Sequence, residues 1–204
     1  MSAVMMMPRR LFQLFWGLNL YGFAMAVMLR ANLGLDPWDV LHQGLASRLG
    51  QSFGMTVNLV GAAVLLLWWP LRQRPGLGTL CNIAVIGTAV DLSLMILPTP
   101  DGYAMRCIWL ASGIVLNGIA GGAYIGAGLG PGPRDGLMTG FCRRTGWPVK
   151  WVRTSIEIGV LAIGWLMGGT VGLGTLLYAA TIGWIVHHAL PFFTITPRER
   201  PALD

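Results

Sequence analysis

Two aspartates, Asp39 and Asp135, occupy the same place in a motif, G-x-x-P-x-D, that occurs twice in the chain. In each copy the proline suits the first position of a helix, so the aspartate falls in the first helical turn. If both short helices face a common cavity, their N-termini present backbone N–H groups and positive dipoles that suit an anionic group. The alternative is that each carboxylate only caps its own helix.

Other ionisable or polar groups lie inside apolar stretches, where a charge costs about 2.5–3.5 kcal/mol on insertion scales. Asp91 and His187 are separated by 96 residues, and a carboxylate opposite a histidine would suit proton coupling. Both also lie toward the ends of their stretches, so they could reach water instead. Glu157 has Arg153 four residues earlier, which favours a plain ion pair. Asn58 could line a pathway or make an interhelical hydrogen bond.

The elements that must position these groups are duplicated. The stretch Gly-Leu-Gly-Thr-Leu occurs at residues 76–80 and again at 172–176, an offset of 172 − 76 = 96. Sliding residues 10–94 over 106–190 without a gap gives 28 identities in 85 pairs. Shared apolar composition would not hold one register over such a span, so the chain contains an internal repeat.

The glycines and threonines of the repeated stretch indicate structure rather than catalysis. Neither copy has the G-x-x-x-x-G-K-[ST] pattern of a phosphate loop. Gly-x-Gly-Thr predicts a tight turn whose threonine caps the next span. The repeated structural residues are Gly34, Pro37, Gly76, Gly78 and Thr79 in the first copy, and Gly130, Pro133, Gly172, Gly174 and Thr175 in the second.

The composition indicates a membrane protein. Of 204 residues, 54% are hydrophobic and 11% are charged, against about 25% charged in soluble domains. The net charge is +6, but the basic residues lie at span ends and in loops, which indicates membrane orientation rather than nucleic-acid binding. Three widely spaced cysteines predict no disulfide framework and no metal site, and no cofactor motif is present.

Hydropathy predicts six spans in one membrane domain of residues 1–204. The first could be a signal peptide, but it pairs with an internal stretch through the repeat, which argues against removal. Between the first and second spans of each repeat lies a short helix, 33–50 in the first copy, that either rests at the interface or re-enters the membrane. The predicted spans are 11–29, 55–71, 79–97, 106–128, 148–167 and 175–193.

The predicted fold class is therefore an all-α membrane protein of two three-span repeats, at about 10–98 and 106–194. Three is an odd number, so the second repeat must enter the bilayer from the opposite side, which makes the repeats inverted. With the N-terminus inside, eleven basic residues fall on the inner side and three on the outer side. This bias predicts that both termini are cytoplasmic.

The predicted fourth span carries Gly118, Gly122 and Gly126 at four-residue spacing. Such a smooth helix face allows close packing of another helix. It could pack inside the chain, or serve as a homodimer seam or a surface for a membrane partner.

The motif residues resemble those of the YczE/YyaS/YitT-type family of bacterial integral membrane proteins. The likeness lies in Gly34, Pro37, Trp38 and Asp39 of the first short helix, followed by the GLGT stretch, and it is closest to the YczE-like branch. It implies a multi-pass protein of the bacterial plasma membrane, without a settled substrate. In the second copy Arg134 stands where the first copy has Trp38, which suggests that the two sides are no longer equivalent.

These observations lead to two expectations of function. Paired short helices in inverted repeats are a transporter design, so the first is a small secondary transporter for an unidentified small solute. The second is an accessory or substrate-binding subunit that works with another membrane protein. We expect no enzyme, because the sequence has no G-x-S-x-G, H-E-x-x-H or S-x-x-K motif.

Overall fold

The computed structural model describes residues 3–195, so the predicted cytoplasmic C-terminus lies outside the described residues. Within that range every regular element is an α-helix, which confirms the all-α prediction. The helices are α1 (Ala3–Ala31), α2 (Pro37–Leu49), α3 (Phe53–Trp68), α4 (Leu77–Ile96), α5 (Tyr103–Gly126), α6 (Pro133–Thr145), α7 (Val149–Leu166) and α8 (Leu173–Phe193).

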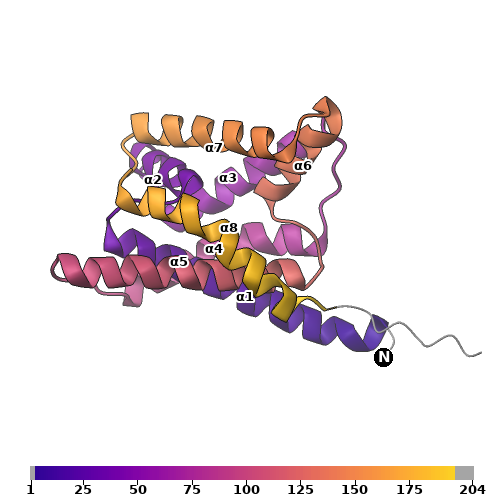
Figure 1. Cartoon of the computed structure of the whole chain (residues 1–204), viewed down its shortest axis with the longest axis horizontal. Coiled ribbons are helices and arrows are strands. Elements are labelled where there is room, and N and C mark those ends of the chain that lie inside the picture. Colours follow the sequence, from indigo (N-terminus) through magenta and orange to yellow (C-terminus); the bar gives the residue numbers. More distant parts are fainter. Residues whose placement is uncertain (1–2, 196–204) are drawn as a thin grey trace, which may run out of the picture.

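The helices form two layers (Figure 1). The long helices α1, α4, α5 and α8 lie together, and the shorter helices α2, α3, α6 and α7 lie over them. Many large apolar side chains face outward: Leu66 is 75% exposed, Met95 79% and Trp184 67%. Such a surface needs lipid around it.

Length and composition support fewer spans than the sequence predicts. Four helices pass as spans, and the α2–α3 pair, bent by 112°, counts as a fifth if it is taken as one. The predicted span 55–71 is realised as α3, which has only 16 residues. At 1.5 Å per residue it covers about 24 Å, less than the roughly 30 Å of a hydrocarbon core. In α7, at the predicted fifth span, Lys150, Arg153 and Glu157 interrupt the apolar sequence.

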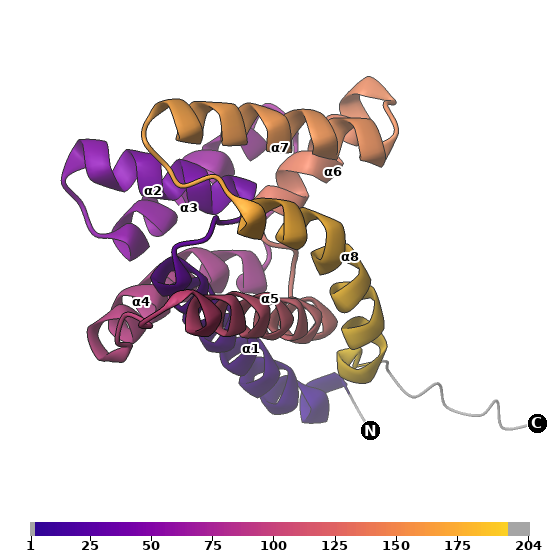
Figure 2. The ribbon, with the colours of Figure 1, turned by 60° about the vertical axis from the view of Figure 1, so that its left-hand side comes forward.

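The centre of the long-helix layer is the pair α1 and α5 (Figure 2). A Cβ on Gly17 would meet Ala123 and the backbone of Tyr124, whereas a Cβ on Gly113 would meet Met28. Contacts made nearer the C-terminus of α1 are therefore made nearer the N-terminus of α5, so the two helices are antiparallel. The contacts also cross at the 96-residue offset, because 17 + 96 = 113 and 28 + 96 = 124.

Each central helix carries the last helix of its own half. Gly22 of α1 packs against Ala89 of α4, and Gly118 of α5 packs in the same way against Ile185 of α8. Gly122 and Gly126 continue this contact, because a Cβ on either glycine would meet Ala189 or Phe193 of α8. The glycine face of α5 is thus occupied by α8 within the chain, and a second helix could use it only by displacing α8.

The turn before α4 is hydrogen-bonded to the second half of the chain, and the turn before α8 is hydrogen-bonded to the first half. The Gly78 N–H donates to the Leu129 carbonyl at 2.8 Å, and the Gly174 N–H donates to the Leu33 carbonyl at the same distance. Thr79 Oγ1 accepts from Gly76 N–H at 3.2 Å, and the second copy repeats this bond at Gly172 and Thr175. Gly34 and Gly130 follow the accepting carbonyls at φ 112° and 125°, which glycine adopts readily.

The short helices also pack across the halves. α2 lies against α7, and α6 lies against α3. Gly164 of α7 contacts the backbone of Val40 and Leu41 in α2. At the equivalent place Gly136 of α6 lies under the Trp68 ring, whose Nε1–H donates to the Pro133 carbonyl at 3.0 Å.

The halves differ where the second short helix meets the last long helix, a contact that we call the seam: α3 with α4 in the first half and α7 with α8 in the second. In the first half α3 packs on α4, where Gly87 N–H donates to Asn58 Oδ1 at 3.1 Å and Gly54 lies against Gly87. In the second half α7 has no comparable packing on α8 within the described range. Lys150 stands where the first half has Gly54, and Gly183, the equivalent of Gly87, has open space beside it.

Candidate functional site

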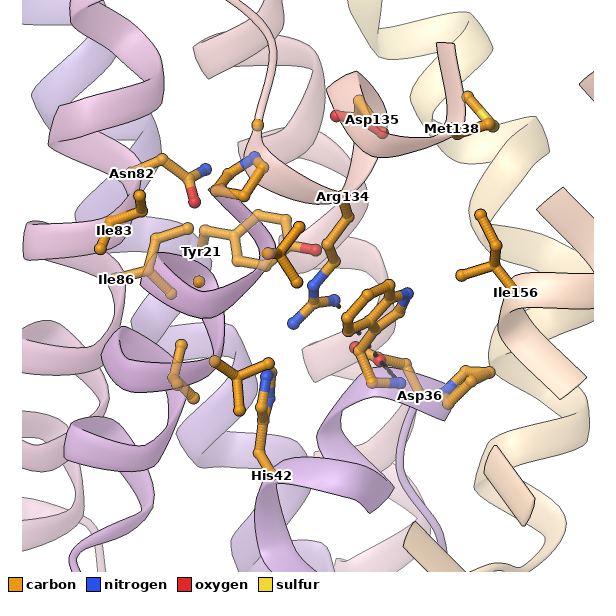
Figure 3. A pocket seen from close by; sticks show the side chains of 18 of the residues that line it. Tyr21, Asp36, His42, Asn82, Ile83, Ile86, Arg134, Asp135, Met138 and Ile156 are labelled. Atoms are coloured by element: carbon orange, nitrogen blue, oxygen red, sulfur yellow. Dashed lines mark hydrogen bonds and ion pairs between the residues drawn. The ribbon is translucent and has the colours of Figure 1, made fainter. Parts of the chain in front are cut away.

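A cavity of about 150 Å³ lies between the two layers, and all eight helices contribute side chains to its wall. It is the place where the N-termini of α2 and α6 meet (Figure 3). The polar and charged lining residues are Tyr21, Asp36, His42, Asn82, Tyr124, Arg134, Asp135, Arg153, Glu157 and Tyr178.

The start of α2 places one carboxylate, Asp36, on the cavity wall and buries a second, Asp39, next to it. Asp36 is the N-cap: its Oδ1 accepts from the backbone N–H of Trp38 at 2.8 Å and of Asp39 at 3.0 Å. Pro37 follows at the first helical position, where its missing N–H costs nothing. Asp39 therefore lies in the first turn, where it is fully buried. The helix ends at Gly50, at φ 64°.

Arg134 of α6 reaches across to these carboxylates. Its Nη1 lies 3.6 Å from Asp36 Oδ1, and its Nη2 lies 3.5 Å from Asp39 Oδ1. The guanidinium carbon lies 5.1 Å from the centre of the Trp38 ring, within the range of a cation–π interaction. Figure 3 shows the Arg134 side chain directed toward Asp36 and away from Asp135. The start of α6 is thus tied electrostatically to the start of α2.

Asp39 has a second neighbour in His42, one turn along α2. His42 Nδ1 lies 3.0 Å from Asp39 Oδ1, and His42 is 1% exposed. The remaining oxygens, Asp36 Oδ2 and Asp39 Oδ2, are buried and have no hydrogen-bond partner among the described residues. Buried carboxylate oxygens normally have such partners, so the cluster retains unused acceptor capacity.

The second predicted aspartate, Asp135, lines the same cavity with different partners. Tyr124 OH donates to its Oδ2 at 3.0 Å. Nearby, Tyr178 OH donates to Asn117 Oδ1 at 2.9 Å. The structure thus brings Asp36 and Asp135 to one cavity, on opposite sides of Arg134, whereas Asp39 is buried next to Asp36 and does not line the wall.

The predicted ion pair between Arg153 and Glu157 is confirmed, with an N–O distance of 2.8 Å. The sequence offered it as an alternative to a functional role. Both residues also line the cavity, so the pair forms part of the wall.

Besides Asp39, three predicted site residues do not line the cavity: Asp91, Asn58 and His187. Asp91 accepts from Ser52 Oγ at 2.5 Å and from Gly54 N–H at 2.8 Å, which fixes the start of α3. Asn58 accepts the bond from Gly87 described above, between α3 and α4. His187 is on α8, where its ring centre lies 5.4 Å from that of His188. No hydrogen bond or ion pair in the described structure joins Asp91 to His187.

Sequence reasoning did not single out Arg134 or His42 as site residues. The available signal was the replacement of Trp38 by Arg134 at the 96-residue offset, which it noted only as a departure between copies. Within residues 3–195 no group of three or more His, Cys, Asp or Glu side chains is placed to hold a metal ion.

The chain is similar to proteins of Haemophilus influenzae and Bacillus subtilis. The sequence profile of DUF6198, described as a family of unknown function, matches residues 8–191. An uncharacterized protein of Haemophilus influenzae is 40% identical over 184 residues, which cover 90% of this chain and 84% of that protein. The uncharacterized membrane protein YczE of Bacillus subtilis is 37% identical over 179 residues, covering 87% and 83%.

A more distant relative is the uncharacterized protein YyaS of Bacillus subtilis, 24% identical over 86% of this chain and 89% of that protein. No solved structure matches. The family profile and the likeness to YczE both extend over most of the chain, and the long apolar helices agree with the membrane assignment of YczE. The chain therefore belongs to the DUF6198 family, as a multi-pass membrane protein of the YczE/YyaS type.

Proposed function

We propose that the protein is a small secondary transporter, or a transporter-like protein, of the bacterial plasma membrane. Its small solute would occupy the cavity between the two halves. The observation that supports this most is the cavity itself, which is lined by all eight helices and by the N-termini of both short helices. Sites of this kind, formed by broken helices at a repeat interface, are typical of secondary transporters.

We also propose that the halves are inverted repeats with three crossings each. In each half the crossings would be the first long helix, the bent pair of short helices, and the last long helix. The antiparallel contact of α1 with α5 supports this. Two antiparallel helices with crossed contacts are related by a two-fold axis perpendicular to both. If they span the bilayer, that axis lies in the membrane plane.

The proposed orientation keeps both termini cytoplasmic. Arg134 and Arg153 line the cavity, so they leave the count of inner basic residues, which falls from 11 to 11 − 2 = 9, against three outer ones. Two of the three outer basic residues, Arg30 and Arg48, bind backbone carbonyls of other helices or turns. Arg30 donates to the Leu94 carbonyl, and Arg48 donates to the Met167 carbonyl. The remaining asymmetry still favours this orientation.

The unequal seams support alternating access. The first half is closed between α3 and α4, where Gly54 lies against Gly87, whereas the second half is open beside Gly183. Two repeats that differ in this way fit a resting state in which one side is closed. The opposite state would open the Gly87 seam and close the Gly183 seam.

The alternative of an accessory subunit predicts a smooth face of small residues turned toward lipid. In the described structure α8 covers the α5 face that carries Gly118, Gly122 and Gly126. This favours the transporter. We also propose that the protein is not an enzyme.

The test is solute flux in proteoliposomes with a panel of small metabolites, at two pH values and with protein-free liposomes as the control. We expect flux of at least one solute, and its loss in Asp39→Asn. If Asp39→Asn and Asp135→Asn both leave flux unchanged, the cavity is not the pathway. If no solute of the panel moves while the protein stays folded, the transporter proposal fails.

A further inference from the structure

We propose that the site at Asp36 and Asp39 takes a small organic cation, of guanidinium or ammonium chemistry, and that the Arg134 guanidinium occupies this place when the solute is absent. The inference rests on the proposed function and names the substrate class of the same cavity. It replaces the anionic group that the paired helix N-termini suggested.

The balance of charge at the cavity favours a cation. The carboxylates on its wall are Asp36 at the N-cap of α2, Asp135 on α6 and Glu157 on α7, with Asp39 buried next to Asp36, and the guanidinium groups are Arg134 and Arg153. Three lining acids and the adjoining Asp39 face two bases, and a charged His42 would still leave an excess of acid. The N-terminal N–H groups of α2, which an anion would need, already bind Asp36. At the start of α2 an entering anion would therefore meet carboxylates and no free N–H group.

The acceptors that a cation would need are present and only partly used. Asp36 is 2% exposed and Asp39 is 0% exposed, and each keeps an Oδ2 without a hydrogen-bond partner in the described structure. Arg134 compensates their charge at 3.5 and 3.6 Å, longer than the roughly 2.7–3.2 Å of a good N–H···O bond. A free ligand of the same charge could make the short bonds that the tethered side chain does not make.

The aromatic wall selects an organic cation over a metal ion. Trp38 already holds a guanidinium 5.1 Å from its ring centre, and Tyr21, Tyr124 and Tyr178 add three further rings to the lining. Ring faces attract weakly hydrated organic cations, whereas hard metal cations require about six oxygen ligands. A cavity of about 150 Å³ suits a small amine or guanidine rather than a peptide.

Exchange of Arg134 for a solute would also change the structure. The side chain of Arg134 is 28% exposed, so it can leave the cluster without crossing packed core. Once it leaves, the electrostatic tie between the starts of α2 and α6 is lost, and the solute takes its place on α2 alone. Binding would thus loosen one half from the other, as the rearrangement of the seams requires.

The experiment measures binding of methylguanidinium to the full chain in nanodiscs by isothermal calorimetry, with acetate and phosphate as anionic probes. We expect Arg134→Ala to bind methylguanidinium at least tenfold more tightly than the unmodified protein, because the internal competitor is gone. Asp39→Asn should abolish binding in either background. Asp101→Asn, in an exposed loop, is the matched control and should change nothing.

Arg134→Gln serves where Arg134→Ala does not fold, because it keeps most of the aliphatic stem and a polar end without the charge. Equal or weaker binding of methylguanidinium by the folded variant overturns the inference, as does binding of acetate or phosphate that depends on Arg134. Flux of anions alone in proteoliposomes overturns it too, but leaves the transporter proposal standing. Tight cation binding without flux of any solute supports the site and refutes transport.

Discussion

The guanidinium of Arg134 lies 5.1 Å from the centre of the Trp38 ring, and the two residues occupy equivalent positions in the two halves of the chain, since 38 + 96 = 134. The contact therefore joins two positions of the sequence repeat that carry complementary side chains, a cation and an aromatic ring.

Removing the charge at position 134 should destabilise the protein. Arg134→Gln leaves Asp36 and Asp39 buried without a compensating charge, a change that costs about 3–5 kcal/mol in buried pairs. We expect about 3 kcal/mol, because the Arg134 side chain is 28% exposed. Thermal unfolding in nanodiscs measures it. The double variant Arg134→Gln with Asp39→Asn should recover part of the lost stability. If the double variant is no more stable than Arg134→Gln alone, the carboxylates do not depend on Arg134.

The contact of α7 with α2 should tolerate no side chain at Gly164. A Cβ there would lie against the backbone of Val40 and Leu41, so Gly164→Ala must separate the helices, at about 1–3 kcal/mol. Gly159→Ala is the matched control on the same helix, because nothing lies near its Cβ position. That variant should be neutral or up to about 1 kcal/mol more stable. Equal losses would contradict this packing.

The open seam offers a test of alternating access. Gly183 has free space beside it, so Gly183→Leu should change thermal stability by less than about 0.5 kcal/mol. Flux should nevertheless fall strongly, because the leucine would block closure of α7 on α8. Gly159→Leu, also at an open position, is the control for a new surface leucine. Unchanged flux in Gly183→Leu would show that this seam does not close.

The orientation can be tested by labelling. In a background without Cys81, Cys107 and Cys142, we expect Asp101→Cys to react with a membrane-impermeant maleimide from outside intact cells. Arg74→Cys should react only after permeabilisation. Both positions are exposed, so burial does not confuse the comparison. The reverse pattern would place the N-terminus outside.

The arrangement of helices could be read from the sequence where it depends on local pattern. The 96-residue offset holds for both ends of α2 and α6, from Pro37 to Pro133 and from Leu49 to Thr145. Prolines, capping residues and glycines set these limits over a few residues. The number of spans could not be predicted from hydropathy, because α3 is short and α7 carries charged residues. Hydropathy also does not say whether two helices joined by a bend cross the membrane together.

The candidate site could be predicted only in part. Asp135 does line the cavity, and Asp39 is buried next to it within reach of Arg134, but Asp91 and Asn58 bind neighbouring helices instead. An intramembrane polar residue can satisfy its bonds on a helix that the sequence does not identify as its neighbour. Arg134 was missed for the same reason: its partners lie almost 100 positions away, and a basic residue near a loop resembles an orientation signal.

The crossed bonds from Gly78 to Leu129 and from Gly174 to Leu33 have a consequence for biogenesis. When α4 enters the membrane, the segment that carries the acceptor for Gly78, Leu129, has still to follow it. The first half must therefore hold an incomplete turn until the second half has been inserted.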